Sequence, residues 1–195
     1  MPQDLTPDDI RERDDRDVRT ARSLAMLLGE ADLVGRRWEI VEERTWPTGE
    51  LDSESDKSRR AHAAGGITAW RSLAEAGATR TAWFEVVPYA TPEDAELSLR
   101  QVPRYFVGTS RPDQTVVSER VVDDQVLPGS TDTWIFEKWT TGPGGDDLSR
   151  YVGGTVDRIL FLTSFGGPDG VWSWADMMAL TTRQAERVRL ALGMD

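Results

Sequence analysis

The segment RYVGGTVDRILFLTSF, residues 150–165, decides the fold. It is rich in β-branched and aromatic residues, which favour extended strands. Its stretch 159–162 (ILFL) is apolar at consecutive positions. Alternating apolar and polar residues would indicate a strand with one face in water, whereas a continuous apolar run indicates a strand covered on both faces. The segment therefore predicts a β-strand with helices on both sides.

Two further β segments precede this one, at 114–122 and 131–141. Turn sequences separate the three segments, with Pro-Gly at 128–129 and GPGG at 142–145. Short strands joined by such turns are typical of antiparallel sheets. We therefore expect a three-stranded antiparallel meander in this half of the chain.

The first half of the chain predicts three more strands. Residues 36–46 (RRWEIVEERTW) have a bulky, β-branched centre and end at a Trp-Pro-Thr-Gly turn. Residues 67–73 and 80–89 flank the sequence EAGA at 75–78, so a β-hairpin is the simplest interpretation. A helix over 69–76 is the alternative.

Three helices are predicted from caps and apolar stripes. Thr6-Pro7 and Thr91-Pro92 each combine an N-cap residue with proline at the first helical position, and Pro103 should bend or end the second helix. A third helix follows the glycine-rich break at 166–170. The expected core-facing residues are Val18, Ala21, Leu24, Ala25 and Leu28 in the first helix, Ala95, Leu99, Val102 and Phe106 in the second, and Trp174, Met178, Thr181, Ala185, Val188 and Leu192 in the last.

A chain of 195 residues suits one packed domain. Residues 1–17 are predicted to be an acidic, partly frayed extension, and residues 18–195 a single α+β domain. Its architecture would be a largely antiparallel sheet flanked by helices on both faces, an α/β/α sandwich. The polar, serine-rich stretch 51–60 is expected to be an exposed, mobile loop.

The composition excludes several classes of function. A formal charge of −11 and a pI near 4.6 repel nucleic-acid backbones and anionic membranes. The absence of cysteine excludes disulfides, thiolate nucleophiles and iron–sulfur clusters, and it suits a reducing cytoplasm. The first apolar stretch, 24–28, is too short for a signal sequence or a membrane span. We therefore expect a cytoplasmic protein with no nucleic-acid or membrane partner.

Three short motifs sharpen the fold prediction: ADLVGRRW at 31–38, RYVGGTV at 150–156 and Gln184-Ala185 in the last helix. Together with the order of elements, they resemble the Mog1/PsbP-like fold, and in particular the actinobacterial sensor-like domains related to the PknH extracellular domain. Those ectodomains typically carry disulfides and follow a membrane anchor or lipoprotein signal, whereas this chain has no cysteine and we expect no such signal in it. The resemblance thus implies a cytoplasmic relative with a binding or scaffold role, and it does not transfer an extracellular sensing role.

No catalytic motif is specific enough to predict an enzyme. His62 is the only histidine, so it cannot form a multi-histidine metal site, and in its polar loop it is better interpreted as a surface residue. Ser164 lacks the Gly-x-Ser-x-Gly elbow of a serine hydrolase, although a Ser-His-Asp assembly stays open. Glu85, Glu137 and Asp157 could approach one another as a carboxylate pair, but ion pairing with basic residues of the same strands is the commoner role. We expect no catalytic residue, metal or cofactor.

The tryptophans carry more information. Most of the eight should fill the core, but aromatic residues on both faces of a strand could also line a groove. The candidate ligand or partner groove consists of Trp83, Trp134, Trp139, Glu85, Glu137 and Arg158.

The function predicted from these observations is a non-enzymatic cytoplasmic module that binds an unidentified protein partner or serves as a scaffold. A small-molecule binding protein or enzyme with a tryptophan-lined pocket is the alternative. Self-association into a homo-oligomer is a third hypothesis.

Overall fold

The structure is a computed structural model that describes residues 7–35, 37–48, 65–102, 106–108, 112–122 and 133–194. Within these ranges the chain forms seven strands, three α-helices and one short 3-10 helix. The strands are β1 (Trp38–Pro47), β2 (Ile67–Glu75), β3 (Thr81–Pro88), β4 (Thr115–Val121), β5 (Thr133–Gly142), β6 (Gly145–Val156) and β7 (Ile159–Gly166). The helices are α1 (Pro7–Ala25), η1 (Glu30–Asp32), α2 (Pro92–Gln101) and α4 (Trp174–Leu192).

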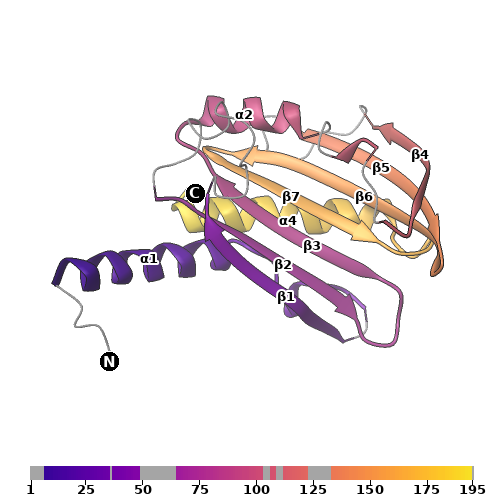
Figure 1. Ribbon diagram of the computed structural model, residues 1–195, viewed down its shortest axis with the longest axis horizontal. Coiled ribbons are helices and arrows are strands. Elements are labelled where there is room, and N and C mark those ends of the chain that lie inside the picture. The colour runs from indigo at the N-terminus through magenta and orange to yellow at the C-terminus, as the bar shows by residue number, and fades with distance from the viewer. Residues whose placement is uncertain are drawn as a thin grey trace.

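All seven strands belong to one sheet, in the order β1-β2-β3-β7-β6-β5-β4 (Figure 1). Each neighbouring pair is antiparallel. Strands β1–β3 form one meander and β4–β7 a second, and the two meet where β3 pairs with β7. The predicted α+β class with an antiparallel sheet is confirmed.

The prediction that residues 150–165 form a single strand is wrong. Strand β6 ends at Val156, which pairs with Ile159 at the start of β7, so only Asp157 and Arg158 lie in the turn. Asp157 has a φ of 51°, a left-handed conformation that aspartate tolerates better than most residues. The hairpin therefore needs no glycine or proline at its tip. The predicted three-stranded meander has four strands for this reason.

The apolar run in β7 does mark a strand buried along its whole length. Phe161 and Phe165 belong to one hydrophobic cluster, called the first cluster below, whereas Leu160 and Leu162 belong to a second cluster. Because successive residues of a strand point to opposite faces, the two clusters lie on opposite faces of the sheet. Helix α4 contributes Met177, Leu180, Ala185 and Val188 to the first cluster, and α2 contributes Ala95 and Leu99 to the second.

The hairpin and the last two helices match the sequence predictions. Strands β2 and β3 pair directly, so the alternative of a helix over 69–76 is wrong. Helix α2 begins at the predicted cap, where the Thr91 hydroxyl accepts a hydrogen bond from the Asp94 N–H at 3.2 Å. Helix α4 is capped in the same way by Ser173 at its start, and its C-cap residue is Gly193, which has a φ of 73°. Glycine adopts this left-handed conformation without steric cost.

The apolar stripe predicted for the first helix is correct only in part, since Leu24 packs against the first cluster but most of the other positions do not. Val18 is 69% exposed, and Ala21 and Ala25 are also exposed. Helix α1 ends at Ala25, so Leu28 reaches the core from the irregular segment that follows. A helical spacing count cannot detect such an early end.

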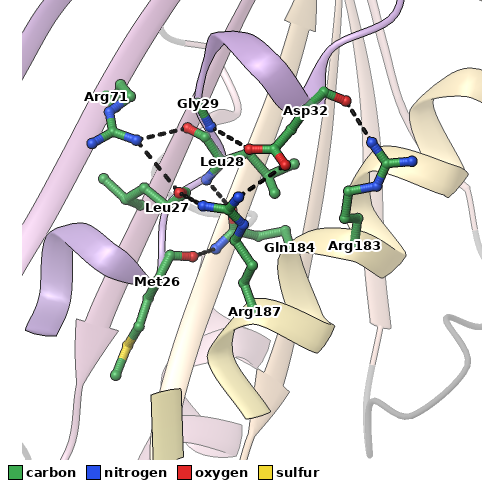
Figure 2. Close-up of polar contacts among 9 residues, drawn as sticks. All are labelled: Met26, Leu27, Leu28, Gly29, Asp32, Arg71, Arg183, Gln184 and Arg187. Atoms are coloured by element: carbon green, nitrogen blue, oxygen red, sulfur yellow. Dashed lines mark hydrogen bonds and ion pairs between the residues drawn. The ribbon is translucent and has the colours of Figure 1, made fainter. Parts of the chain in front are cut away.

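Gln184 of α4 fixes the chain where it leaves α1. Its side-chain amide donates to the Met26 carbonyl at 2.7 Å, and its oxygen accepts from the Leu28 N–H at 3.1 Å. Gln184 is fully buried, so both backbone groups are satisfied without water. Figure 2 shows this side chain reaching from α4 to the segment between α1 and η1.

Arginines hold the neighbouring carbonyls of the same segment. Arg71 of β2 donates to the Leu28 carbonyl at 3.0 Å, and Arg187 of α4 donates to the Leu27 carbonyl at 3.0 Å (Figure 2). Arg187 also pairs with Asp32 at 2.9 Å, and Asp32 accepts from the Gly29 N–H at 2.7 Å. One peptide segment thus joins the sheet, α4 and η1.

Several expectations fall outside the described residues. These are the cap at Thr6, the strand start at Arg36, the polar loop at 51–60, the histidine at 62, and the prolines at 103 and 128.

Replacing Gln184 tests the importance of this contact. The change Gln184→Met keeps the volume but leaves the Met26 carbonyl and the Leu28 N–H buried without partners. We expect the free energy of unfolding to fall by about 3 kcal/mol, measured by urea denaturation, because each unsatisfied buried group costs about 1–3 kcal/mol. Glu186→Ala, on the exposed side of α4, is the control and should change the free energy by less than about 0.5 kcal/mol. Equal midpoints for Gln184→Met and the parent chain would contradict the assignment.

Candidate functional site

A broad hollow of about 840 Å³ lies against strands β1, β2 and β3. We call it the aromatic hollow, because three tryptophans and a phenylalanine are among its lining residues. It borders the second hydrophobic cluster, against which Trp83 and Phe106 pack. The lining residues are Glu42, Glu43, Arg44, Thr45, Trp46, Trp70, Trp83, Glu85 and Phe106.

The register of the strands creates this surface. Trp70 of β2 lies opposite Glu85 of β3 and also opposite Arg44 of β1. Paired residues of antiparallel strands share a face, so these three side chains form a row across the sheet. Their neighbours Phe84 and Val86 point the other way, into the first cluster.

One wall of the aromatic hollow rests on stacked rings. The Phe106 ring lies 6.5 Å from Trp83, 5.7 Å from Trp134 and 4.5 Å from Tyr151, centroid to centroid. Aromatic pairs in this range stabilise one another beyond simple burial. The wall is therefore well supported, while Trp83 itself stays only half-buried.

The charged residues of the hollow are unequal in number, with three carboxylates and one arginine. Arg44 pairs with Glu42, and Arg71 pairs with Glu43 through Nε at 2.6 Å. Ion pairs thus balance the charges of Glu42 and Glu43, and Glu43 lies with Arg71 on the face of the sheet opposite Trp70.

The structure brings together two of the six residues proposed for the groove. Trp83 and Glu85 line the aromatic hollow. Trp134 lies behind Phe106 and is 8% exposed, and its indole N–H has no hydrogen-bond partner in the described part of the chain. Arg158 lies in the β6–β7 turn and lines a different pocket.

Trp139 and Glu137 are on strand β5, at positions that alternate with Trp134 and Phe136. They therefore point to the face opposite the second cluster. Trp139 lies opposite Leu148 of β6 and stays half-buried. Neither residue is part of the hollow.

Glu137 forms a buried ion pair with Arg150 and a second pair with the more exposed Arg120. The Arg150 Nε donates to its carboxylate at 2.6 Å. Burial acts to raise the pKa of Glu137, but the hydrogen bonds and charges of Arg150 and Arg120 outweigh it, so the pKa lies below its ordinary value. The residue is ionised and structural.

The carboxylates considered for catalysis do not meet. Glu85 lines the hollow, Glu137 points to the other face of the sheet, and Asp157 is exposed in a turn. Ser164 is buried opposite Trp83, while His62 lies outside the described residues. Among the described residues, no group of three or more histidines and acids could hold a metal ion. None of the described helices is long and apolar enough to cross a membrane.

Sequence reasoning missed Trp46, Trp70 and Phe106 as residues of the hollow. Trp70 directly follows the buried Ala69 in strand β2, so the two side chains point to opposite faces of the sheet. This alternation was the available sequence signal that Trp70 lies on the other face. The pairing of Arg44 with Trp70 depends on the β1–β2 register, which contains an irregularity between Ile40 and Glu42. No sequence pattern predicts that change of register.

The fold and the hollow define an α+β domain with one antiparallel sheet and an aromatic surface beside α2. No family model matches the chain, and no curated protein matches its sequence. Among solved structures, the extracellular domain of PknH from Mycobacterium tuberculosis is similar, with a TM-score of 0.55 and 11% sequence identity. The match covers 86% of this chain and 96% of that domain, so the chain has a fold like that of the PknH extracellular domain.

A second solved structure is an uncharacterised protein of Mycobacterium smegmatis, the ortholog of Rv0999. Its TM-score is 0.42 at 11% identity, over 88% of this chain and 95% of that protein.

The pKa of Glu137 predicts a specific pH dependence. Because its pKa is lowered in the folded state, its ion pairs stabilise the fold above the ordinary value of 4.5 and lose that effect as the pH falls through the lower folded value. Glu137→Gln should lower the free energy of unfolding by about 3 kcal/mol at neutral pH, since it removes the closest carboxylate of the buried Arg150, whose other ion pair, with Asp169, spans 3.9 Å. The difference from the parent chain should shrink on acidification below 4.5.

Denaturant titrations at a series of pH values would measure this difference. Glu39→Gln is the control, because the Arg37–Glu39 pair is exposed and should contribute less than about 1 kcal/mol at any pH. A Glu137→Gln deficit that stays constant down to the acid transition would show that the carboxylate charge is not its source.

Proposed function

We propose that this protein is a non-enzymatic binding module and that the aromatic hollow receives a segment of a protein partner. The observation that carries the proposal is the row of Arg44, Trp70 and Glu85 beside the exposed part of Trp83. Tryptophan and arginine are the residues that contribute most often to the binding energy of protein interfaces. The PknH-like fold supports this role by analogy, because the similar structure is an extracellular domain of PknH.

The chemistry of the hollow indicates what the partner segment should present. The rings of Trp46, Trp70 and Trp83 suit a large apolar side chain. The carboxylate of Glu85 at the hollow and the net charge of −11 of the chain favour basic residues on either side of that anchor. A lysine or arginine could also lie over a tryptophan ring.

A small-molecule ligand is the second candidate. The volume of about 840 Å³ falls within the range of about 300–1,000 Å³ that is usual for ligand sites. Such a ligand would be apolar or cationic for the same reasons as the peptide segment.

Two finer expectations also stay proposals. One is the Mog1/PsbP-like sandwich, supported by the two hydrophobic clusters that α4 and α2 build from alternate residues of β7. The other is a cytoplasmic location, which rests on the cysteine-free composition.

Selection from a random peptide library on the purified chain would test the proposed function. We expect enriched peptides to combine a large apolar residue with flanking lysines or arginines. Trp70→Ala should weaken the binding of these peptides by about 30-fold, because loss of a central interface tryptophan costs about 2 kcal/mol or more. Affinities would be measured by fluorescence anisotropy.

Trp139→Ala is the matched control, since it removes a half-buried strand tryptophan that lies outside the hollow. Denaturation midpoints of both variants would show whether they fold. Absence of enriched peptides, or peptides that bind Trp70→Ala and Trp139→Ala equally well, would contradict a protein-binding hollow. Enriched peptides without basic residues would contradict the proposed charge preference.

A further inference from the structure

A second and smaller pocket, of about 200 Å³, lies on the other side of the sheet. We call it the arginine pocket. Its walls come from α1, the start of β2, the end of β3, the β6–β7 turn and the end of α4. The lining residues are Arg19, Arg22, Ser23, Met26, Gly65, Gly66, Ile67, Val86, Pro88, Arg158, Ile159 and Leu192.

The floor of the arginine pocket is apolar and well packed. Met26, Ile67, Val86 and Ile159 are all buried at 5% exposure or less. Three of them, Met26, Val86 and Ile159, belong to the first hydrophobic cluster, on the face opposite the aromatic hollow. The floor is therefore a rigid part of the core, suited to contact with hydrocarbon.

Three guanidinium groups line the same pocket, and none of its described lining residues carries a carboxylate. This is the reverse of the whole chain, in which 34 acidic residues outnumber 23 basic ones. Arg19 and Arg22 are three residues apart on α1 and therefore lie on one helical face. Arg158 approaches from the β6–β7 turn.

The three arginines differ in the hydrogen bonds that they make within the protein. Arg22 donates through Nε and Nη2 to the Ala191 carbonyl, at 3.2 and 2.9 Å, and keeps its other N–H groups. Arg19 and Arg158 make no side-chain hydrogen bond or ion pair with any other described residue. Gly65 leaves room for Arg19, because a β-carbon there would lie 3.3 Å from the Arg19 Nη1.

We propose that the arginine pocket binds a small organic anion, with its carboxylate held by the arginines and its hydrocarbon part against the apolar floor. Guanidinium groups present paired N–H donors that match the geometry of a carboxylate. An apolar cavity of about 150 Å³ holds benzene, so a pocket of 200 Å³ accommodates one ring with a short side chain. A nucleotide or a peptide segment is too large for it.

The ligand 3-phenylpropionate is a suitable probe, since it carries one ring and one carboxylate. Titrating it into the full-length ¹⁵N-labelled chain should produce saturable shifts of the backbone amide signals of Gly65, Gly66, Ile67 and Ile159. The neutral 3-phenylpropionamide should bind at least about tenfold more weakly, because charged hydrogen bonds are roughly twice as strong as neutral ones. Added salt should weaken only the anion.

Two substitutions test the arginines without disturbing the core. Arg19→Gln and Arg158→Gln each remove one exposed guanidinium and should weaken 3-phenylpropionate binding by about five- to tenfold. Arg13→Gln is the matched control, because it removes the same charge from an exposed position of α1 outside the pocket. The ¹⁵N spectra of all three variants would show that they fold.

The proposal is overturned if 3-phenylpropionate produces no saturable shifts at these amides. Equal affinity for the amide and the acid, or equal weakening by Arg13→Gln, would overturn it as well. The outcome is independent of the peptide experiment, because the two surfaces share no residue.

Discussion

The arrangement of the domain depends on the hydrogen bonds that Gln184 makes to the segment after α1. A helix that ends inside a protein leaves carbonyl groups without partners, and burial makes each of them costly. Here one amide side chain from α4 satisfies a carbonyl and an N–H of this segment, while Arg71 and Arg187 satisfy the next carbonyls. These contacts join residues that are 43 to 160 positions apart along the chain. They hold α1, β2 and α4 in one arrangement, and the walls of the arginine pocket come partly from these same elements.

The second constraint is the pairing of β3 with β7. This pairing places β7, which is buried along its whole length, beside β3, which carries the half-buried Trp83. Helix α2 packs on β6 and β7, and the aromatic hollow lies over β1–β3 on the adjoining part of the sheet. The hollow is therefore a consequence of helix placement and strand register, with Phe106 at the border between the two regions.

The sequence predicted the parts of the fold that follow from local rules. Thr91 as a cap, the β2–β3 hairpin and the burial of β7 all follow from one residue type or one short pattern. Local rules did not predict the early end of α1, because the segment after it is held by Gln184, which is more than 150 residues away along the chain. Local rules also did not predict the β6–β7 turn, because Asp157 adopts the left-handed conformation at a position where glycine is usual. For the candidate site, Trp83 and Glu85 could be inferred from alternation along one strand, but Trp70 and Arg44 required the register between strands.

The two surfaces differ in their local charge, and the net charge of the chain does not show this difference. The described lining of the aromatic hollow has three carboxylates, two of them paired with arginines, whereas that of the arginine pocket has three arginines and no carboxylate. Strand β3 links them, since Trp83 and Glu85 face the hollow while Val86 lies in the floor of the pocket. Exposed charges more than about 10 Å apart are largely screened in physiological salt, so each surface selects its occupant by its own local charge. Under the two proposals, a single acidic chain binds a basic segment on one face of its sheet and an organic anion on the other.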